Sequence, residues 1–206
     1  MLPNQDWVRL NLDSFKPIPI GKRLCICPSW LDAPNPNIVN IILDPGLAFG
    51  TGSHPTTALC LEWLDQQIDS QSLVVDYGCG SGILAIAALK LGAKKVIAID
   101  YDPQALMATR ANAERNGITN DQLETYLPSD FQDEISADLV VANILAKPLI
   151  ELKDRFLALA KPKGQILLSG ILDSQVTEII DVYQKNWQMD PPIIKDGWAC
   201  LAGIKK

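Results

Sequence analysis

The sequence is poor in basic residues and in histidine, and it contains no long apolar run. It has 18 lysines and arginines against 24 aspartates and glutamates, which gives a net charge of −6. Because duplex- and RNA-binding surfaces usually carry a basic stripe, we expect no direct binding of nucleic acid. The apolar runs fall short of a membrane span, and the first residues lack the pattern of a signal peptide. These absences favour a cytoplasmic protein, without a membrane partner, that acts on a basic protein or a small molecule.

The cysteines give no sign of a metal site or of disulfides. The five cysteines include no CxxC pair, and the chain has a single histidine, His54. Zinc sites draw on clusters of these two residue types, so we predict no bound metal. Cys25 and Cys27 lie two residues apart in an expected strand, where their side chains share a face but cannot easily bridge. The thiols are therefore predicted to be reduced, as is usual in the cytosol.

Proline divides the chain into two regions. Residues 1–45 hold seven of the 14 prolines and are predicted to form an N-terminal extended or linker segment, with short strands at 23–27 and 39–43. Residues 46–206 are expected to form the main domain. A chain of 206 residues with 48% hydrophobic side chains is large enough for one sizeable core.

Beyond residue 45, short apolar runs alternate with helical patterns. Uniformly apolar strands separated by helices are typical of a parallel sheet covered on both faces. The predicted strands are 72–77, 95–100, 122–127, 138–143, 164–170, 187–194 and 198–205, and the predicted helices are 55–68, 82–92, 102–117, 147–160 and 173–186. Only three residues separate the last two strands, which predicts an antiparallel edge. The expected fold class is doubly wound α/β with a mostly parallel seven-stranded sheet.

Local signals mark the ends of several helices. Pro55 and Pro103 are expected in first helical turns, and Asp102 as an N-cap. Gly92 and Gly117 are expected directly after helix ends, where a left-handed backbone is common.

The segment VVDYGCGSGILAIAALKLGAKKVIAID (74–100) has the pattern of a nucleotide-binding strand–turn–helix–strand unit. A strand ends at Asp76, a turn contains Gly78, Gly80 and Gly82, and the next strand ends at Asp100. In doubly wound sheets, ligands bind at the carboxyl ends of the strands. Asp100 lies 22 residues beyond Gly78, the separation expected for a carboxylate that accepts hydrogen bonds from ribose hydroxyls.

The spacing of the glycines distinguishes two cofactors. A dinucleotide fingerprint requires G-x-G-x-x-G/A, whereas here the glycines follow G-x-G-x-G and position 83 is a bulky isoleucine. Asp76 would be poorly placed beside a pyrophosphate, but it suits a cationic amino group. S-adenosyl-L-methionine combines an ammonium, a carboxylate and a ribose, and it satisfies all these features. The alternative is that the glycines only form a tight turn.

A second glycine-rich loop, DPGLAFGTGSHPTT (44–57), precedes the first helix of the main region. It resembles the corresponding loop of the bacterial ribosomal protein methyltransferases of the PrmA type, which modify large-subunit ribosomal protein eleven. The resemblance covers nearly the whole chain, through DWVRLNLDSFKPIPIGKRLCICPSW (6–30), VVDYGCGSGILAIAALKLGA (74–93), AIDYDPQAL (98–106), NAERNG (112–117) and VVANILAKPL (140–149).

This resemblance implies a class I methyltransferase fold and S-adenosyl-L-methionine as cofactor. It also implies transfer of methyl groups to lysine side chains and an N-terminal amine of that ribosomal protein. The family's cofactor positions fall on Thr57, Gly78, Asp100 and Asn143.

The residues of the second loop are compatible with that assignment. Thr57 falls in the first turn of a helix, where its hydroxyl and the free backbone N–H groups can meet the methionyl carboxylate. Phe49 can face the sulfonium if the loop folds over the ligand. His54, beside a proline at a helix start, is expected to be a cap or loop-packing residue rather than a general base.

Asn143 is the candidate catalytic residue. It matches the asparagine of N-P-P-Y sites in amino-group methyltransferases, whose side-chain and backbone oxygens accept hydrogen bonds from the target nitrogen. The residues that follow are Ile-Leu-Ala, which argues against a flipped adenine as substrate. The alternative is that Asn143 only caps the strand end. Because methyl transfer from a sulfonium depends mainly on positioning, we predict no essential proton-transfer residue.

The sequence departs from the family at its N-terminus. Family members carry a further small α/β domain before the segment that matches 6–30, and this sequence begins at the connecting segment. One alternative is therefore a non-catalytic cofactor-binding module that lacks its recognition domain, although Asn143 and the 44–57 loop argue against it. The other is a methyltransferase of the same fold that acts on another protein or a small amine, which would not be expected to carry the 44–57 loop.

Overall fold

The computed structural model describes residues 16–44, 52–132 and 135–206. A small sheet near the N-terminus contains β1 (Ile18–Ile20), β2 (Leu24–Cys27) and β3 (Val39–Ile42). β1 is antiparallel to β2, and β2 is parallel to β3. The two strands predicted here are confirmed, and β1 is an additional short edge strand that accommodates Pro19. All five cysteines lie in the described residues and form no disulfide, as predicted, and all five are buried.

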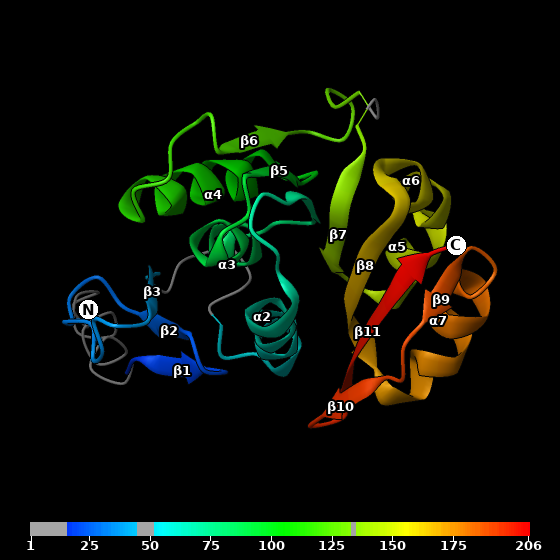
Figure 1. Ribbon diagram of the computed structural model, residues 1–206, viewed down its shortest axis with the longest axis horizontal. Coiled ribbons are helices and arrows are strands. Elements are labelled where there is room, and N and C mark those ends of the chain that lie inside the picture. Colours follow the sequence, from blue (N-terminus) through cyan, green and yellow to red (C-terminus); the bar gives the residue numbers. More distant parts are fainter. Residues whose placement is uncertain (1–15, 45–51, 133–134) are drawn as a thin grey trace, which may run out of the picture.

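The main sheet contains eight strands within the described residues. Its order is β6-β5-β4-β7-β8-β11-β10, with β9 also paired to β11 (Figure 1). β4, β5, β6, β7 and β8 pair with one another in parallel, and β11 is antiparallel to β8. The strands are β4 (Leu73–Tyr77), β5 (Lys95–Ile99), β6 (Leu123–Tyr126), β7 (Ala137–Asn143), β8 (Ala160–Leu172), β9 (Trp187–Met189), β10 (Ile193–Lys195) and β11 (Trp198–Lys205). The predicted doubly wound α/β fold with an antiparallel edge is confirmed.

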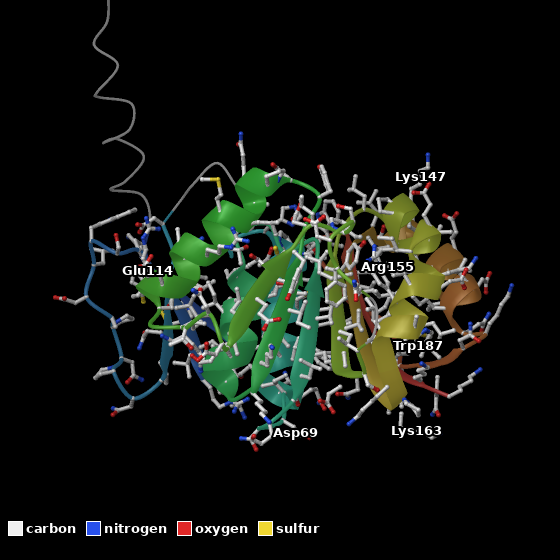
Figure 2. The ribbon with its side chains drawn as sticks, turned by 90° about the horizontal axis from the view of Figure 1, so that it is seen from above. Asp69, Glu114, Lys147, Arg155, Lys163 and Trp187 are labelled. Carbon is white, nitrogen blue, oxygen red and sulfur yellow. The ribbon has the colours of Figure 1, made fainter. Side chains whose placement is uncertain are left out.

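Helices cover both faces of this sheet, as Figures 1 and 2 show. One face packs in an apolar cluster with α2 (Pro55–Gln67), α3 (Ile83–Leu91) and α4 (Pro103–Arg115), and the small sheet contributes to the same cluster. The other face packs with α5 (Ala146–Glu151), α6 (Lys153–Leu159) and α7 (Val176–Tyr183). A short 3₁₀ turn, Asp173–Gln175, directly precedes α7. None of the helices in the described ranges is long and apolar enough to cross a membrane.

Two predicted elements are divided in the structure. The predicted helix 147–160 is two helices, because Leu152 leaves the helical conformation (ψ 3°) and the turn there brings Leu149 and Phe156 into one core. The predicted strand 187–194 is β9 and β10, separated by Pro191 and Pro192, which have no N–H to donate to β11. β9 and β10 both pair with β11 and together occupy the seventh position of the sheet.

The predicted helix signals are confirmed. The side chains of His54 and Asp102 cap α2 and α4, each directly before a proline in the first turn. Gly92 and Gly117 follow α3 and α4 with φ of 122° and 71°, conformations that a residue with a Cβ rarely adopts.

Candidate functional site

The candidate site lies at the carboxyl ends of the strands, where β4 is flanked by β5 on one side and β7 on the other. The chain leaves β4 toward β5 and β6, and it crosses to β7 and β8 on the opposite side. This switch point opens a crevice for a ligand in doubly wound sheets. In Figure 2, Lys147, four residues beyond the end of β7, marks this edge, and Asp69, before β4, marks the opposite one. Asp76, Asp100 and Asn143 all reach the carboxyl edge, as the sequence predicts.

The glycine turn between β4 and α3 is held in a conformation that requires glycine. Gly78, Gly80 and Gly82 have φ of 81°, 55° and 79°. A Cβ at Gly78 would collide with the side chain of Ile144, and one at Gly82 would lie 2.8 Å from Cγ2 of Thr109. Glycine at these two positions therefore lets the turn pack closely against Ile144 and Thr109, which a side chain would prevent.

Asp100 joins the glycine turn to the start of α4. One carboxylate oxygen accepts a hydrogen bond from the Gly80 N–H at 2.9 Å, and the other accepts from the Asp102 N–H at 3.0 Å. The residue is 7% exposed. Each oxygen keeps a further lone pair, so the carboxylate can also accept hydrogen bonds from ribose hydroxyls. The hydrogen bond between Asp100 and Gly80 was not foreseen from the sequence.

Asp76 is a buried carboxylate with one unpaired oxygen. It is 1% exposed, and Oδ2 accepts a hydrogen bond from the Ala85 N–H at 3.1 Å. Oδ1 is buried and has no hydrogen-bond partner among the described residues. The pKa of Asp76 is raised to about 7: burial is the main cause, the Ala85 hydrogen bond lowers the pKa, and the nearby Asp100 charge raises it. A buried acceptor without a partner is costly, so this position fits a cationic group of a ligand.

Asn143 and Thr57 connect the end of β7 to the start of α2, in which the 44–57 segment ends. Nδ2 of Asn143, at the end of β7, donates to the hydroxyl of Thr57, in the first turn of α2, at 3.4 Å. Thr57 is fully buried. Oδ1 of Asn143 is buried and lacks a partner within the described part of the chain. The site therefore presents a second unpaired acceptor a short distance from the first turn of a helix.

His54 serves as a cap, as predicted. Its Nδ1 accepts a hydrogen bond from the Thr56 N–H at 3.3 Å and lies 2.8 Å from the Thr56 hydroxyl. Its ring packs edge-on against Trp198, with 4.8 Å between ring centroids. Phe49, the candidate for contact with the sulfonium, lies outside the described residues.

Arg155 is a supporting residue that the sequence does not reveal. From α6, its guanidinium donates to the hydroxyl of Tyr77 at 3.0 Å and to the carbonyl oxygen of Pro128 at 3.0 Å. Tyr77 directly precedes the glycine turn, and Pro128 lies in the connection between β6 and β7. Arg155 thus ties two loops of the carboxyl edge together. The interaction spans 78 residues and has no local sequence signal.

The residues of the edge fit the ligand that the sequence suggests. The carboxylates of Asp76 and Asp100 and the two unpaired acceptor oxygens, on Asp76 and Asn143, suit an ammonium and hydroxyl groups. Within the residues that the structure describes, no group of three or more His, Cys, Asp or Glu is arranged to hold a metal ion.

The strand order, the antiparallel edge and the site at the switch point define a class I S-adenosylmethionine-dependent methyltransferase fold. A family model described as "Ribosomal protein L11 methyltransferase (PrmA)" matches residues 1–206. The chain belongs to this family.

Relatives with this name are similar over the whole chain. A ribosomal protein L11 methyltransferase from Tolumonas auensis is 56% identical over 206 residues, which are all of this chain and 70% of the relative. One from Aeromonas hydrophila is 56% identical over 204 residues, or 99% of this chain and 70% of the relative. The chain thus spans about 70% of the length of these relatives.

Solved structures agree with the family assignment. The crystal structure of a ribosomal protein L11 methylase from Lactobacillus delbrueckii subsp. bulgaricus has a TM-score of 0.84 and 35% identity, and the match covers 93% of this chain and all of that one. An RNA methyltransferase from Salinibacter ruber, solved with S-adenosyl-L-homocysteine, has a TM-score of 0.56 at 20% identity over 71% of this chain. That second likeness concerns the fold alone.

Proposed function

We propose that this chain is a protein N-methyltransferase that transfers methyl groups from S-adenosyl-L-methionine to amines of ribosomal protein L11, on lysine side chains and at the N-terminus. The family membership and the names of the relatives support the substrate. The observation that carries the cofactor is the buried, unpaired Oδ1 of Asp76 beside the glycine turn. When bound, the cofactor supplies an electrophilic methyl group on a sulfonium.

The chain's own residues divide the work of holding the cofactor. Asp76 is assigned to the ammonium, Asp100 to the ribose hydroxyls, and the main chain at Gly78 and Gly80 to close contact with the ligand. Thr57, in the first turn of α2, is assigned to the carboxylate, which a helix N-terminus favours. The Thr56 and Ala58 N–H groups, which the sequence suggested for the same role, instead donate to the side chain and the carbonyl oxygen of His54. Phe49 is assigned to contact with the sulfonium, on the basis of its place in the 44–57 segment.

Asn143 is assigned to the acceptor amine. Its unpaired Oδ1 can accept a hydrogen bond from the target nitrogen and aim the nitrogen lone pair at the methyl group. Its Nδ2 is already engaged with Thr57, which fixes the orientation of the amide. The family's position and the unpaired oxygen both favour this role over a simple strand cap.

The amine has to be neutral to attack. A free lysine, with a pKa of about 10.4, needs about 4–5 kcal/mol to lose its proton at pH 7. Desolvation in the site and a neighbouring positive charge both lower the pKa of an amine. The site therefore needs no general base, and His54 is engaged in capping α2.

Binding and turnover together test the proposal. We expect S-adenosyl-L-homocysteine to bind in calorimetry and NADH not to bind, and we expect labelled methyl groups to appear on purified L11. Asn143→Ala should lower turnover about 100-fold because a misplaced acceptor loses the attack geometry. The matched control is Asn120→Ala, an exposed asparagine in the connection before β6, which should retain full activity.

Three results would contradict parts of the proposal. Tight NADH binding without S-adenosyl-L-homocysteine binding would overturn the cofactor assignment. Methylation of small amines or another protein, but not of L11, would support the alternative of a methyltransferase with another substrate. Cofactor binding without transfer to any amine would support a non-catalytic module.

A further inference from the structure

Helix α4 and its C-cap residue carry a row of buried or half-buried polar side chains that the proposed mechanism does not use. Thr109, Asn112 and Asn116 are spaced at three and four residues, so they lie along one face of the helix and its C-terminal end. Thr109 and Asn112 are buried although a helix of this kind normally buries apolar side chains. Buried polar groups persist where they have specific partners, and each of these has one outside the helix.

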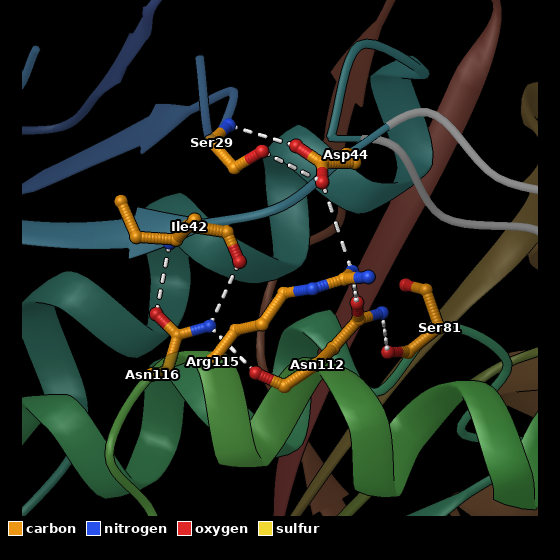
Figure 3. A network of polar contacts seen from close by, with 7 residues as sticks. All are labelled: Ser29, Ile42, Asp44, Ser81, Asn112, Arg115 and Asn116. Atoms are coloured by element: carbon orange, nitrogen blue, oxygen red, sulfur yellow. Dashed lines mark hydrogen bonds and ion pairs between the residues drawn. The ribbon is translucent and has the colours of Figure 1, made fainter. Parts of the chain in front are cut away.

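The first part of the row holds the glycine turn. The Thr109 hydroxyl donates to the Gly80 carbonyl oxygen at 3.0 Å. Nδ2 of Asn112 donates to the Ser81 carbonyl oxygen at 2.8 Å, as Figure 3 shows. The Asp102 N–H, at the start of α4, donates to Asp100, which accepts from the Gly80 N–H, so α4 holds the turn at Gly80 and Ser81 both directly and through Asp100.

The last residue of the row holds the end of β3. Oδ1 of Asn116 accepts a hydrogen bond from the Ile42 N–H, and Nδ2 donates to the Ile42 carbonyl oxygen, both at 2.8 Å (Figure 3). The side-chain amide thus pairs with the main chain of Ile42 as another strand would. Nδ2 also donates to the carbonyl oxygen of Asn112 at 2.8 Å, which links the two asparagines.

A neighbouring ion pair extends the same connection. Arg115 donates to Oδ1 of Asn112 at 3.0 Å, and its guanidinium lies 3.8 Å from the Asp44 carboxylate. Asp44 in turn accepts hydrogen bonds from the N–H and the hydroxyl of Ser29. Asp44 is the first residue of the 44–57 segment that distinguishes this family in the sequence. The C-terminal half of α4 therefore contacts both the glycine turn and the start of the 44–57 segment (Figure 3).

We propose that Asn112 and Asn116 are positioning residues for the cofactor, which set the glycine turn and the start of the 44–57 segment in register on one helix. Neither side chain is assigned to the ligand itself. Asn116 contacts β3 and Asn112 but not the glycine turn, so its effect on cofactor affinity passes through the helix and Asn112. This inference rests on the proposed function, since it requires a cofactor bound by the glycine turn.

Isosteric variants test the inference. Asn112→Asp keeps the acceptor for Arg115 but loses the donor to Ser81, and it places a carboxylate against a carbonyl oxygen. Asn116→Asp likewise keeps one bond to Ile42 and loses the other. Because each change leaves a buried or partly buried carbonyl oxygen without its donor, we expect the Kd of S-adenosyl-L-homocysteine and the KM of the cofactor to rise about tenfold. The value of kcat at saturating cofactor should stay near that of the unchanged protein.

Two further variants keep the test decisive. Asn120→Ala, the exposed control, should leave Kd, KM and melting temperature unchanged. Arg115→Met changes a half-exposed side chain, so it should fold even if a buried variant does not, and it should raise Kd about threefold by releasing Asp44 and Asn112.

The outcomes separate this inference from the proposed function. The inference alone would be overturned if the unchanged protein binds S-adenosyl-L-homocysteine and the folded variants Asn112→Asp, Asn116→Asp and Arg115→Met have the same Kd and KM as that protein. This holds even if the melting temperature of the variants is lower. A fall in kcat with an unchanged KM would also overturn it. An unchanged protein that fails to bind S-adenosyl-L-homocysteine would overturn the proposed function, and the inference with it.

Discussion

At the scale of single residues, the site depends on polar atoms that are buried without a hydrogen-bond partner. Asp76 and Asn143 each have a buried oxygen without a partner in the described structure. Such atoms destabilise the fold, and they are retained where a ligand or substrate supplies the missing partner. Both residues were predicted from their places at strand ends. Their unpaired oxygens were not, because these depend on what surrounds each side chain.

Asp76 should show this conflict between stability and binding as a pH effect. Its pKa is about 7 in the fold against 3.8 as the ordinary value, so between these pH values the folded chain holds a proton that the unfolded chain has lost. The free energy of unfolding therefore falls as pH rises through this window, by about 1.4 kcal/mol for each step of one in pH. Asp76→Asn should consequently melt at a higher temperature than the unchanged protein at pH 8, and at a similar temperature at pH 4.

The same substitution should weaken cofactor binding. The amide of the Asp76→Asn variant would keep an acceptor for the Ala85 N–H but would lack the charge that attracts an ammonium, so the Kd of S-adenosyl-L-homocysteine should rise. In the unchanged protein, affinity should increase with pH up to about 7 as the carboxyl ionises. Asp121→Asn, at an exposed aspartate, is the control for both measurements. A stability profile that is the same for Asp76→Asn and the unchanged protein would contradict this account.

At the scale of elements, helix starts and strand ends assemble the site. α2, α3 and α4 begin at or beside the carboxyl edge, and two of them begin with a side-chain cap followed by proline. These starts were predictable because caps and prolines are local signals. The division of helix 147–160 was not, because it follows from the burial of Leu149 and Phe156 in a core that other elements complete.

The cap of α2 gives a prediction for His54. Loss of the hydrogen bond to the Thr56 N–H, together with the ring contact to Trp198, should destabilise the protein by about 0.5–2 kcal/mol in His54→Ala. Turnover at saturating substrate should persist at temperatures where the variant is folded. Gln66→Ala, exposed near the other end of the same helix, is the control. Abolished turnover with intact cofactor affinity would identify His54 as a catalytic residue and refute the prediction.

At the scale of the whole molecule, the small sheet and the main sheet share one apolar cluster. Ile20, Leu24 and Ile41 belong to the same buried group as residues of α2 and α3. Asp65 of α2 also accepts a hydrogen bond from the Lys22 N–H at 2.9 Å and pairs with Arg23 at 3.0 Å. The boundary between regions 1–45 and 46–206 stays a prediction, but these contacts indicate that the two regions unfold together.

Calorimetry tests that expectation. We expect a single unfolding transition, and Leu24→Ala, which empties a buried position, should destabilise the whole protein by about 2–5 kcal/mol as one unit. Leu31→Ala, at a largely exposed leucine, should have little effect. Two separate transitions, with only the smaller one shifted by Leu24→Ala, would contradict a shared core.

The sequence by itself determined the fold class, the glycine turn and the acids at the strand ends. Hydrophobic periodicity, helix caps and glycine spacing are local patterns, so they can be recognised without knowledge of tertiary contacts. The sequence also shows that three polar residues are spaced to lie on one face of a helix: Thr109, Asn112 and Asn116. Their role becomes visible only from the hydrogen-bond partners that they have in the structure. Tertiary structure alone decided that Arg155 reaches Tyr77 across 78 residues, and that Asn116 pairs with Ile42 across 74. The physical reason is that hydrogen bonds between distant segments form only once the sheet and its helices have packed together. The desolvation that raises the pKa of Asp76 likewise exists only in the folded chain.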